Sequence, residues 1–363
     1  MFPKIKARNI SIIKKIESKK FEDENLDKEM LKFKSMISGK YFDPWKLRGE
    51  KMQMLQQVGI NFANVMEKKG SEEISNDEAL FIKRASYGVT MEYEKGYEFE
   101  NMTQYDMNSS HGFIMAHEKF YIPFKKGTIG KIHEIDDSKI GIYRLHIKGN
   151  PSKYCVKVRN DGQYCGYYTQ YDMLMMDFLG VEYELDQVEE FNSCVWDKTE
   201  CVKGSDLFGE LMTQLFKAKS QNSGSIKEIS KFLMASLHGQ LSTLYEKEYS
   251  LNVLDKYKIE DVKQINVQNE TFTLKGSPFI YHLGRIKPFI YSFSRLTMGR
   301  IAHKVMKKGY KVVKINTDCI VTDAPEKWFD KKFNISDKIG HFKIEKKFEG
   351  KHIINGLHKI DKI

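Results

Sequence analysis

Two aspartates in the sequence stand where a carboxylate could hold a metal ion. The first, Asp106, follows an apolar and aromatic segment at the end of a predicted strand, and Asn108, Ser109 and Ser110 then offer backbone donors near a helix start. A carboxylate at a strand end beside free N–H groups suits a metal-bound triphosphate. The alternative is an aspartate that caps the following helix.

The second aspartate, Asp318, lies between two apolar segments in KVVKINTDCIVTD, a pattern that predicts strand, turn and strand. Asp318 is then expected at the tip of the hairpin. Two carboxylates that meet across a sheet can bridge two Mg²⁺ ions. The alternative here is an aspartate that only forms a turn.

Between the two aspartates lies a lysine-bearing helical segment, FKAKSQNSGSIKEISKFLMASLHGQLS. Lys219 and Lys231 flank its polar break, so that two helices could present both ammonium groups to one anion. Lys231, Met234, Ala235 and His238 recur at helical spacing and form one stripe. Such a stripe suits a triphosphate with a stacked base, and the alternative is a solvated amphipathic helix.

The elements that position these residues are predicted to be mixed. Residues 1–80 have helical periodicity, whereas strand-like alternation and aromatic residues begin at Tyr87. The segment 141–174 is typical of a small sheet of hairpins, and 205–245 and 286–308 are typical of helices. No regular βαβ alternation is present, so we expect an α+β fold.

Composition indicates a globular protein with an acidic partner. The 363 residues carry 59 Lys and Arg against 49 Asp and Glu, and the net charge of +10 favours a polyanion. No stretch has the roughly 18 to 20 apolar residues of a membrane helix, so no membrane partner is expected. Five scattered cysteines without CxxC pairs predict free thiols in a reducing, intracellular compartment. The basic start is interpreted as a solvated helix, with an organellar address as the alternative.

Taken in order, the three segments resemble motifs A, B and C of family B DNA polymerases, especially the protein-primed viral, plasmid and organellar branch. Motif A of that family, Asp-x-Asn-Ser-Leu-Tyr-Pro, is similar to residues 106–112. Motif B, Lys-x-x-x-Asn-Ser-x-Tyr-Gly, is similar to 231–239, and motif C, Asp-Thr-Asp-Ser, to 316–319. The resemblance extends from about Tyr87 to the end of the chain.

The resemblance implies a DNA-directed DNA polymerase that works by two-metal nucleotidyl transfer on a palm with short helical fingers. Asp106 and Asp318 would be the catalytic and metal-binding residues, with two Mg²⁺ ions and Mn²⁺ as a substitute. The deoxynucleoside triphosphate would be bound by the lysines and by the matching motif positions, namely Lys219, Lys231, His111, His238 and Gly239.

The resemblance also implies contacts with a DNA primer-template. Tyr87 and Gly88 resemble the first part of the family's Tyr-Gly-Gly element, which contacts the template strand. The C-terminal segment resembles the stretch that leads to a primer-gripping Lys-x-Tyr motif, in which Lys351 or Lys359 would supply the lysine. A terminal priming protein is a further expected partner, and the host cytoplasm or an organelle is the expected location.

Four positions depart from the family motifs. Asn316 replaces the first aspartate of motif C, and His111 replaces a tyrosine that blocks a ribose 2′-OH. Ala235 and His238 replace residues that seat the nucleotide. These departures motivate an alternative, a catalytically impaired remnant that acts as a nucleic-acid-binding or scaffold protein. A third hypothesis, an RNA-templated or RNA-making polymerase, rests on His111 alone.

The same resemblance predicts a division of the chain. About 85 residues precede the lead-in to motif A, too few for an exonuclease domain, so we expect no proofreading. Little sequence follows the palm, so we expect a reduced thumb and low processivity. The expected regions are a helical N-terminal region at 1–85, a palm at 86–112 and 286–363, an insertion that docks a priming protein at 113–205, fingers at 206–245 and a second small insertion at 246–285.

Overall fold

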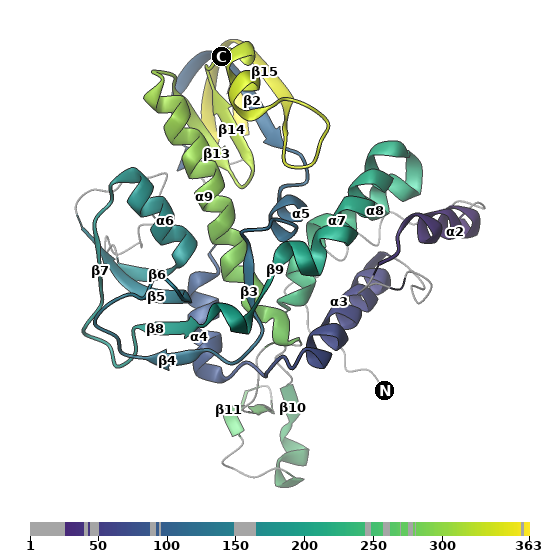
Figure 1. Ribbon diagram of the computed structural model, residues 1–363, viewed down its shortest axis with the longest axis vertical. Coiled ribbons are helices and arrows are strands. Elements are labelled where there is room, and N and C mark those ends of the chain that lie inside the picture. The colour runs from purple at the N-terminus through teal and green to yellow at the C-terminus, as the bar shows by residue number, and fades with distance from the viewer. Residues whose placement is uncertain are drawn as a thin grey trace.

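The computed structural model describes most of the chain after residue 25 (Figure 1). The described residues are 26–39, 43, 51–87, 92–93, 96–148, 165–243, 248–256, 262–268, 270–274, 279, 281–356 and 359–363. Helices and strands are mixed along them, and the paired strands of each sheet are antiparallel. The predicted α+β class is confirmed. None of the described helices has the length and apolarity needed to cross a membrane.

A six-stranded antiparallel sheet carries both predicted aspartates, in the strand order β1-β13-β14-β2-β15-β16. Its strands are β1 (Glu92–Tyr93), β2 (Glu98–Met107), β13 (Val312–Asn316), β14 (Cys319–Thr322), β15 (Phe342–Gly356) and β16 (Lys359–Lys362). β13 and β14 form the predicted hairpin, in which Asn316 pairs with Cys319. Thr317 and Asp318 are the two turn residues, and Thr317 has a φ of 57°.

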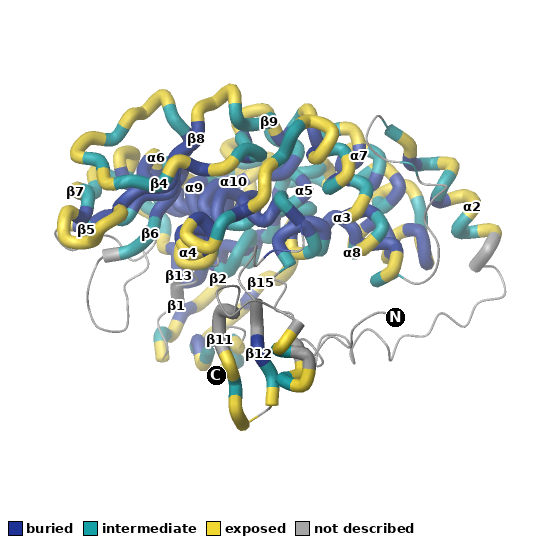
Figure 2. The backbone as a smooth tube through the Cα atoms, turned by 90° about the horizontal axis from the view of Figure 1, so that it is seen from below, coloured by how far each residue is buried: buried dark blue, intermediate teal, exposed yellow. Residues whose placement is uncertain are grey.

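Two helices, α9 (Ile286–Lys307) and α10 (Glu326–Phe333), share an apolar cluster with this sheet. The rings of Tyr105 in β2 and Phe329 in α10 stack with centroids 3.8 Å apart. Figure 2 shows α9 as largely buried, and its buried residues run from its first turn almost to its end. The helix stops just before Gly309, which has a φ of 94°, as the sequence predicted.

A second, five-stranded sheet lies beside the lower part of α9 (Figure 1). Its strands are β4 (Thr128–Gly130), β5 (Ile140–Ile147), β6 (Cys165–Thr169), β7 (Tyr183–Leu185) and β8 (Ser193–Trp196). The predicted hairpin sheet is therefore present in part, and 149–164 lie outside the described residues. The prediction is wrong from Gln170 onward, because Gln170–Leu179 form helix α6. The Thr169 and Asp172 side chains form a capping box that starts this helix.

The lysine-bearing segment forms two long helices, α7 (Gly204–Gln221) and α8 (Gly224–Leu241), separated at the predicted polar break. They pack against each other and against the short helix α5 (Ser110–Met115), which follows β2. The helical prediction for 205–245 is confirmed over these bounds.

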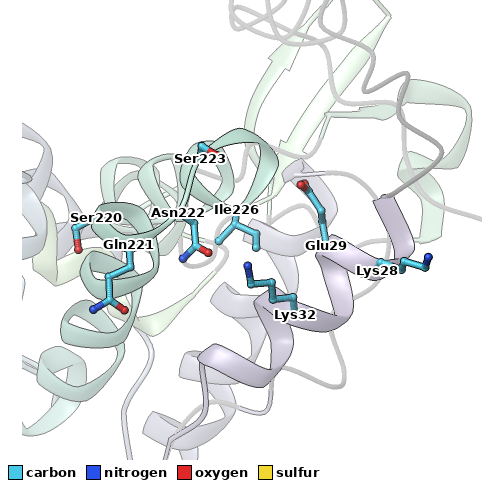
Figure 3. Close-up of a pocket in the computed structure, with 8 residues that line it drawn as sticks. All are labelled: Lys28, Glu29, Lys32, Ser220, Gln221, Asn222, Ser223 and Ile226. Carbon is cyan, nitrogen blue, oxygen red and sulfur yellow. The ribbon is translucent and has the colours of Figure 1, made fainter.

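The N-terminal part is helical where it is described, with α2 (Leu26–Met36), α3 (Lys51–Lys68) and α4 (Asn76–Ala85). α3 and α2 both contact α8. A polar hollow of about 600 Å³ lies between α2 and the turn that joins α7 to α8 (Figure 3). Its lining contains none of the predicted site residues and consists of Lys28, Glu29, Lys32, Ser220, Gln221, Asn222, Ser223 and Ile226.

The remaining elements are small. They are the paired strands β3 (Tyr121–Pro123) and β9 (Cys201–Lys203), the sheet of β10 (Glu248–Ser250), β12 (Thr271–Leu274) and β11 (Val262–Asn266), and the 3₁₀ helices at Lys198–Glu200, Leu251–Lys256 and His282–Arg285. The three-stranded sheet projects away from the rest of the molecule at the bottom of Figure 1.

Two buried ion pairs connect α9 to its neighbours. Arg295 forms a bidentate pair with Asp172 of α6, with N–O distances of 2.8 and 2.9 Å. Arg285 pairs with Glu78 of α4 and also donates to the carbonyls of Glu72 and Glu73. Each guanidinium therefore has its charge and its donors satisfied inside the protein, which a buried arginine requires.

Candidate active site

The sheet brings Asp106 and Asp318 to one place. Asp106 is the penultimate residue of β2 and pairs in antiparallel register with Cys319, the first residue of β14. The carbonyl of Asp318 accepts a hydrogen bond from Met107 N at 3.0 Å. The two aspartates are thus neighbours at the same end of adjacent strands. The predicted meeting of the two residues follows from the register of β14 against β2.

The two carboxyl groups influence each other. Burial raises the pKa of Asp318 to about 7, and the negative charge of Asp106 adds to the rise. Two carboxylates in one partly buried place are unfavourable unless a cation offsets their charge. This arrangement therefore favours binding of a positively charged group between or beside them.

A lysine from the neighbouring strand lies against Asp106. Lys343 of β15 is paired in register with Asp106, on the side of β2 opposite to Cys319. Its Nζ is 2.8 Å from Asp106 Oδ2. Burial lowers the pKa of Lys343, but the hydrogen bond and the charge of Asp106 outweigh burial and the pKa is raised. Sequence reasoning missed Lys343, because only the register of β15 against β2 distinguishes it from other lysines of FKIEKKFEGK.

A second lysine approaches from the helical side. Lys219, in the last turn of α7, donates from Nζ to Ser109 Oγ at 2.9 Å. Ser109 precedes α5 in a left-handed conformation with a φ of 52° and makes no capping bond with its side chain. Burial lowers the pKa of Lys219, as do the nearby charges of Lys343 and Lys231, while Asp106 opposes them. Lys219 is therefore within electrostatic range of both Lys231 and Asp106.

Lys231 is exposed on α8, and Gly239 is exposed two turns further along that helix. A Cβ added to Gly239 would meet no atom within 4 Å. This face of α8 is thus open at both predicted positions, and a ligand could approach it without displacing protein atoms.

The two predicted histidines pack against each other. The ring centroids of His111 in α5 and His238 in α8 are 4.3 Å apart, and Tyr291 of α9 lies 5.8 Å from His238. Burial lowers the pKa of His111 to about 4 and that of His238 to about 3. His111 Nε2 and His238 Nδ1 are buried without a hydrogen-bond partner. Both rings are thus neutral at pH 7, and sequence reasoning gave no signal for Tyr291.

The remaining motif C position, Asn316, stays at the end of β13. Its Oδ1 accepts a hydrogen bond from Thr317 Oγ1 at 3.2 Å. The side chain is partly exposed next to the hairpin turn. The amide oxygen at this position is a neutral potential metal ligand where the motif that it resembles has a carboxylate.

The described residues among the predicted DNA contacts have partners other than the two carboxylates. The ring of Tyr87 is covered by the Arg295 guanidinium, 3.9 Å from its centroid, and Gly88 lies outside the described residues. Lys351 pairs in register with Glu100, which lies six residues before Asp106 and therefore roughly 20 Å away along β2.

Lys359 opens the edge strand β16 and forms an ion pair of 3.3 Å with Asp361. Its side chain is highly exposed. Neither Lys351 nor Lys359 thus contacts the paired aspartates, and their predicted role in primer binding stays a prediction.

The donor set fits a hard divalent cation. Asp106 and Asp318 offer carboxylate oxygens, and Mg²⁺ is usually bound by one or two carboxylates together with substrate phosphates. In the described part of the chain, no group of three or more His, Cys, Asp and Glu side chains is arranged to hold a metal ion. The site therefore fits a cation that shares its coordination with a phosphate ligand, rather than a closed structural metal site.

The fold belongs to a known class. The structure resembles Phi29 DNA polymerase complexed with single-stranded DNA, with a TM-score of 0.61 and 15% identity over 84% of this chain. It also resembles the ternary complex of that polymerase with primer-template DNA and incoming nucleotides, with a TM-score of 0.58 and 14% identity over 84% of this chain. Each match covers 54% of the polymerase chain. The six-stranded sheet with its helices is thus a polymerase palm-like fold.

In sequence, the chain is homologous to a protein described as a probable DNA polymerase from Podospora anserina. The two are 23% identical in an alignment of length 330 that covers 76% of this chain and 25% of that protein. No family model matches the sequence. The chain spans about a quarter of the length of this curated relative and about half the length of the matched polymerase structures.

Proposed function

We propose that this chain extends a DNA primer by template-directed transfer of deoxynucleotides, with Asp106 and Asp318 as metal-binding catalytic residues. The observation that carries the proposal is that these two carboxylates lie at the same end of adjacent strands, with the ammonium of Lys219 from helix α7 within electrostatic range of Asp106. Carboxylates for cations and ammonium groups for phosphates are the two requirements of nucleotidyl transfer. Homology to a probable DNA polymerase supports the proposal.

Each group has a separate task in this proposal. Asp106 and Asp318 would hold two divalent cations, Mg²⁺ or Mn²⁺ in its place. Cations bound there supply activation of the primer hydroxyl and charge stabilisation on the leaving pyrophosphate. Lys219 and Lys231 bind the triphosphate and orient it toward the carboxylates. Gly239 leaves room for the nucleotide on the open face of α8.

The proposal keeps the predicted division of the chain. The six-stranded sheet with α9 and α10 serves as palm, α7 and α8 as fingers, and the segments 113–205 and 246–285 as insertions. Docking of a terminal priming protein on 113–205 remains part of the proposal, supported by position in the chain. Synthesis without proofreading, which the resemblance in sequence implies, remains part of the proposal.

Contacts with the duplex are proposed at some distance from the reacting atoms. A lysine roughly 20 Å from Asp106, such as Lys351, would contact the primer backbone about six base pairs behind its end, given 3.4 Å per nucleotide. Lys359 is the alternative, and Tyr87 with Gly88 remains the proposed template contact.

Template dependence tests the proposal. The purified chain is incubated with Mg²⁺, a labelled primer and templates that differ in the first unpaired base. We expect incorporation only of the complementary deoxynucleotide, and Mn²⁺ should support the same choice. Incorporation that ignores the template would contradict the proposal. Parallel reactions with ribonucleotides measure how well the His111 ring excludes a 2′-OH.

The second candidate function is that of an impaired remnant that binds nucleic acid. The observation that favours it is the packing of His238 against His111, because His238 is only 7% exposed where a nucleotide-binding residue is expected. This alternative predicts salt-sensitive DNA binding with no metal-dependent incorporation. A chain that binds the primer-template but extends none of the templates would support it.

A further inference from the structure

Lys343 occupies a position defined by strand pairing rather than by a chance contact. β2 is flanked by β14 and β15, and the residue opposite Asp106 is Cys319 on one side and Lys343 on the other. Directly paired residues have Cβ atoms about 4.5 to 5.5 Å apart, so the ammonium is within reach of the carboxylate in this register. The observed Nζ to Oδ2 distance is 2.8 Å.

The ammonium has acidic neighbours besides Asp106. Asp318 and Glu345 both lie within electrostatic range of Lys343. Glu345 lies where the register of β15 shifts between Ile344 and Lys346, and its carboxylate accepts a hydrogen bond from Gln104 Nε2. The ammonium of Lys343 is therefore within electrostatic range of three carboxyl groups, those of Asp106, Asp318 and Glu345.

The side chain of Lys343 is more exposed and more flexible than that of Asp106. The side chain of Lys343 is 46% exposed, whereas that of Asp106 is 21% exposed. A lysine also carries its charge on a flexible four-carbon stem. The ammonium can consequently move toward solvent or Glu345, while the carboxylate stays at the end of β2.

We propose that Lys343 is the resident counter-ion of Asp106, and that a divalent cation reaches the Asp106–Asp318 pair by exchange with its ammonium. The inference rests on the proposed metal-binding role of the two aspartates. The exchange is between cations and moves no proton. It makes occupation of the site depend on divalent cation concentration, and it frees a positive charge beside the place where the triphosphate would bind.

Metal binding without DNA or nucleotide tests the inference. Electron paramagnetic resonance of free Mn²⁺ gives the dissociation constant for wild type, Lys343→Met and Lys343→Arg. We expect Lys343→Met to bind Mn²⁺ about three- to tenfold more tightly, because a competing, partly exposed ion pair of about 1 kcal/mol is removed. Lys343→Arg keeps the charge and should remain within about twofold of wild type, because less than 0.5 kcal/mol changes.

A matched control comes from the same strand. Lys346 carries the same charge but lies over the Phe348 ring, 4.8 Å from its centroid, and pairs in register near Gln104. Lys346→Met should leave the Mn²⁺ constant close to that of wild type. The exchange would be supported if Lys343→Met binds Mn²⁺ more tightly and Lys346→Met does not. Adding Asp106→Asn to Lys343→Met should then abolish the gain.

Two results would overturn the inference, and they are distinguishable. Unchanged or weaker Mn²⁺ binding by Lys343→Met, with wild-type binding that still depends on Asp106, would refute the exchange and leave the proposed function standing. Absence of Asp106-dependent Mn²⁺ binding in all the proteins would refute the metal site itself, and with it both proposals.

Discussion

At the scale of single residues, the site combines two carboxylates in unlike surroundings. Asp106 is paired with Lys343, whereas burial and the charge of Asp106 raise the pKa of Asp318 to about 7. Replacing Asp318 by asparagine removes the repulsion and keeps the shape of the side chain. Without divalent cations at pH 8, the Asp318→Asn protein should be more stable by about 1 to 2 kcal/mol. Urea unfolding measures this, and a less stable variant would contradict the electrostatic account.

The buried histidine pair predicts sensitivity to acid. Burial holds the pKa values of His111 and His238 at about 4 and about 3, below the ordinary value of 6.5. Above pH 6.5 both histidines are neutral in the folded and in the unfolded chain, and the stability is at its full value. As the pH falls from 6.5 toward 4, the unfolded chain binds more protons than the folded chain, so that stability is lost. The positive charge of Lys287 in α9 also lowers the pKa of His238.

Between pH 7.5 and 5.0 the free energy of unfolding should fall by roughly 2 kcal/mol for each of the two histidines. His238→Phe keeps an aromatic ring and should remove about half of that fall. Urea unfolding at the two pH values measures it. An identical fall in wild type and variant would show that the pair does not titrate as described.

Residues near the carboxylates differ in how far the sequence could predict them. The positions of Asp106 and Asp318 were predictable because Asp106 lies at the end of a recognisable strand pattern and Asp318 lies in the turn of a recognisable hairpin pattern. Lys343 was not, since its proximity to Asp106 depends on the pairing of β15 with β2 across more than 200 residues. The predicted primer contact Lys351 belongs to the same strand, but register places it roughly 20 Å from the aspartate. Local sequence patterns predict the strands, but the register between distant strands determines which side chains lie next to each other.

At the scale of elements, α9 connects the palm-like sheet to the rest of the molecule. Its C-terminal half shares the apolar cluster of the six-stranded sheet, buried Arg295 lies in its N-terminal half, and buried Arg285 directly precedes its first residue. Arg295 also donates to the carbonyl of Tyr87 at 2.6 Å. Through Arg295, α9 is therefore linked both to Asp172 of α6 and to Tyr87, which precedes β1.

Loss of Arg295 should be costly. Arg295→Met leaves the Asp172 carboxylate buried without its partner, and breaking a buried pair in this way costs roughly 3 to 5 kcal/mol. The control is Lys347→Met, which removes an exposed pair with Glu326 and should cost less than about 1 kcal/mol. Chemical denaturation compares the two. Equal losses would contradict the structural role of Arg295.

Helix α6 was missed in the sequence, although the residues that start and end it are present there. Thr169 and Asp172 form a capping box, and Gly180 closes the helix with a φ of 67°. These are ordinary start and stop signals. The two adjacent tyrosines of β6 just before Thr169 favoured a strand, and the strand pattern was extended too far. By contrast, α7, α8 and α9 were predictable from long helical periodicity.

At the scale of the whole molecule, the net charge of +10 and the lysines near the carboxylates favour an acidic ligand. Binding to a DNA primer-template should weaken strongly with salt, because each phosphate contact releases counterions. For about four contacts, affinity should fall roughly 10²-fold between 50 and 200 mM salt. Fluorescence anisotropy with a labelled duplex measures it. An affinity that is independent of salt would exclude phosphate contacts as the basis of binding.

The catalytic assignment of Asp106 and Asp318 is tested most directly by single-turnover addition of one deoxynucleotide to a primer-template. Asp106→Asn and Asp318→Asn are compared with Asp361→Asn, which changes a partly exposed acid on β16. We predict that each of the first two substitutions lowers the rate by roughly 10²- to 10³-fold or more, since each removes a metal-binding carboxylate, and that Asp361→Asn has no comparable effect. Incorporation at the wild-type rate by both Asp106→Asn and Asp318→Asn would contradict it.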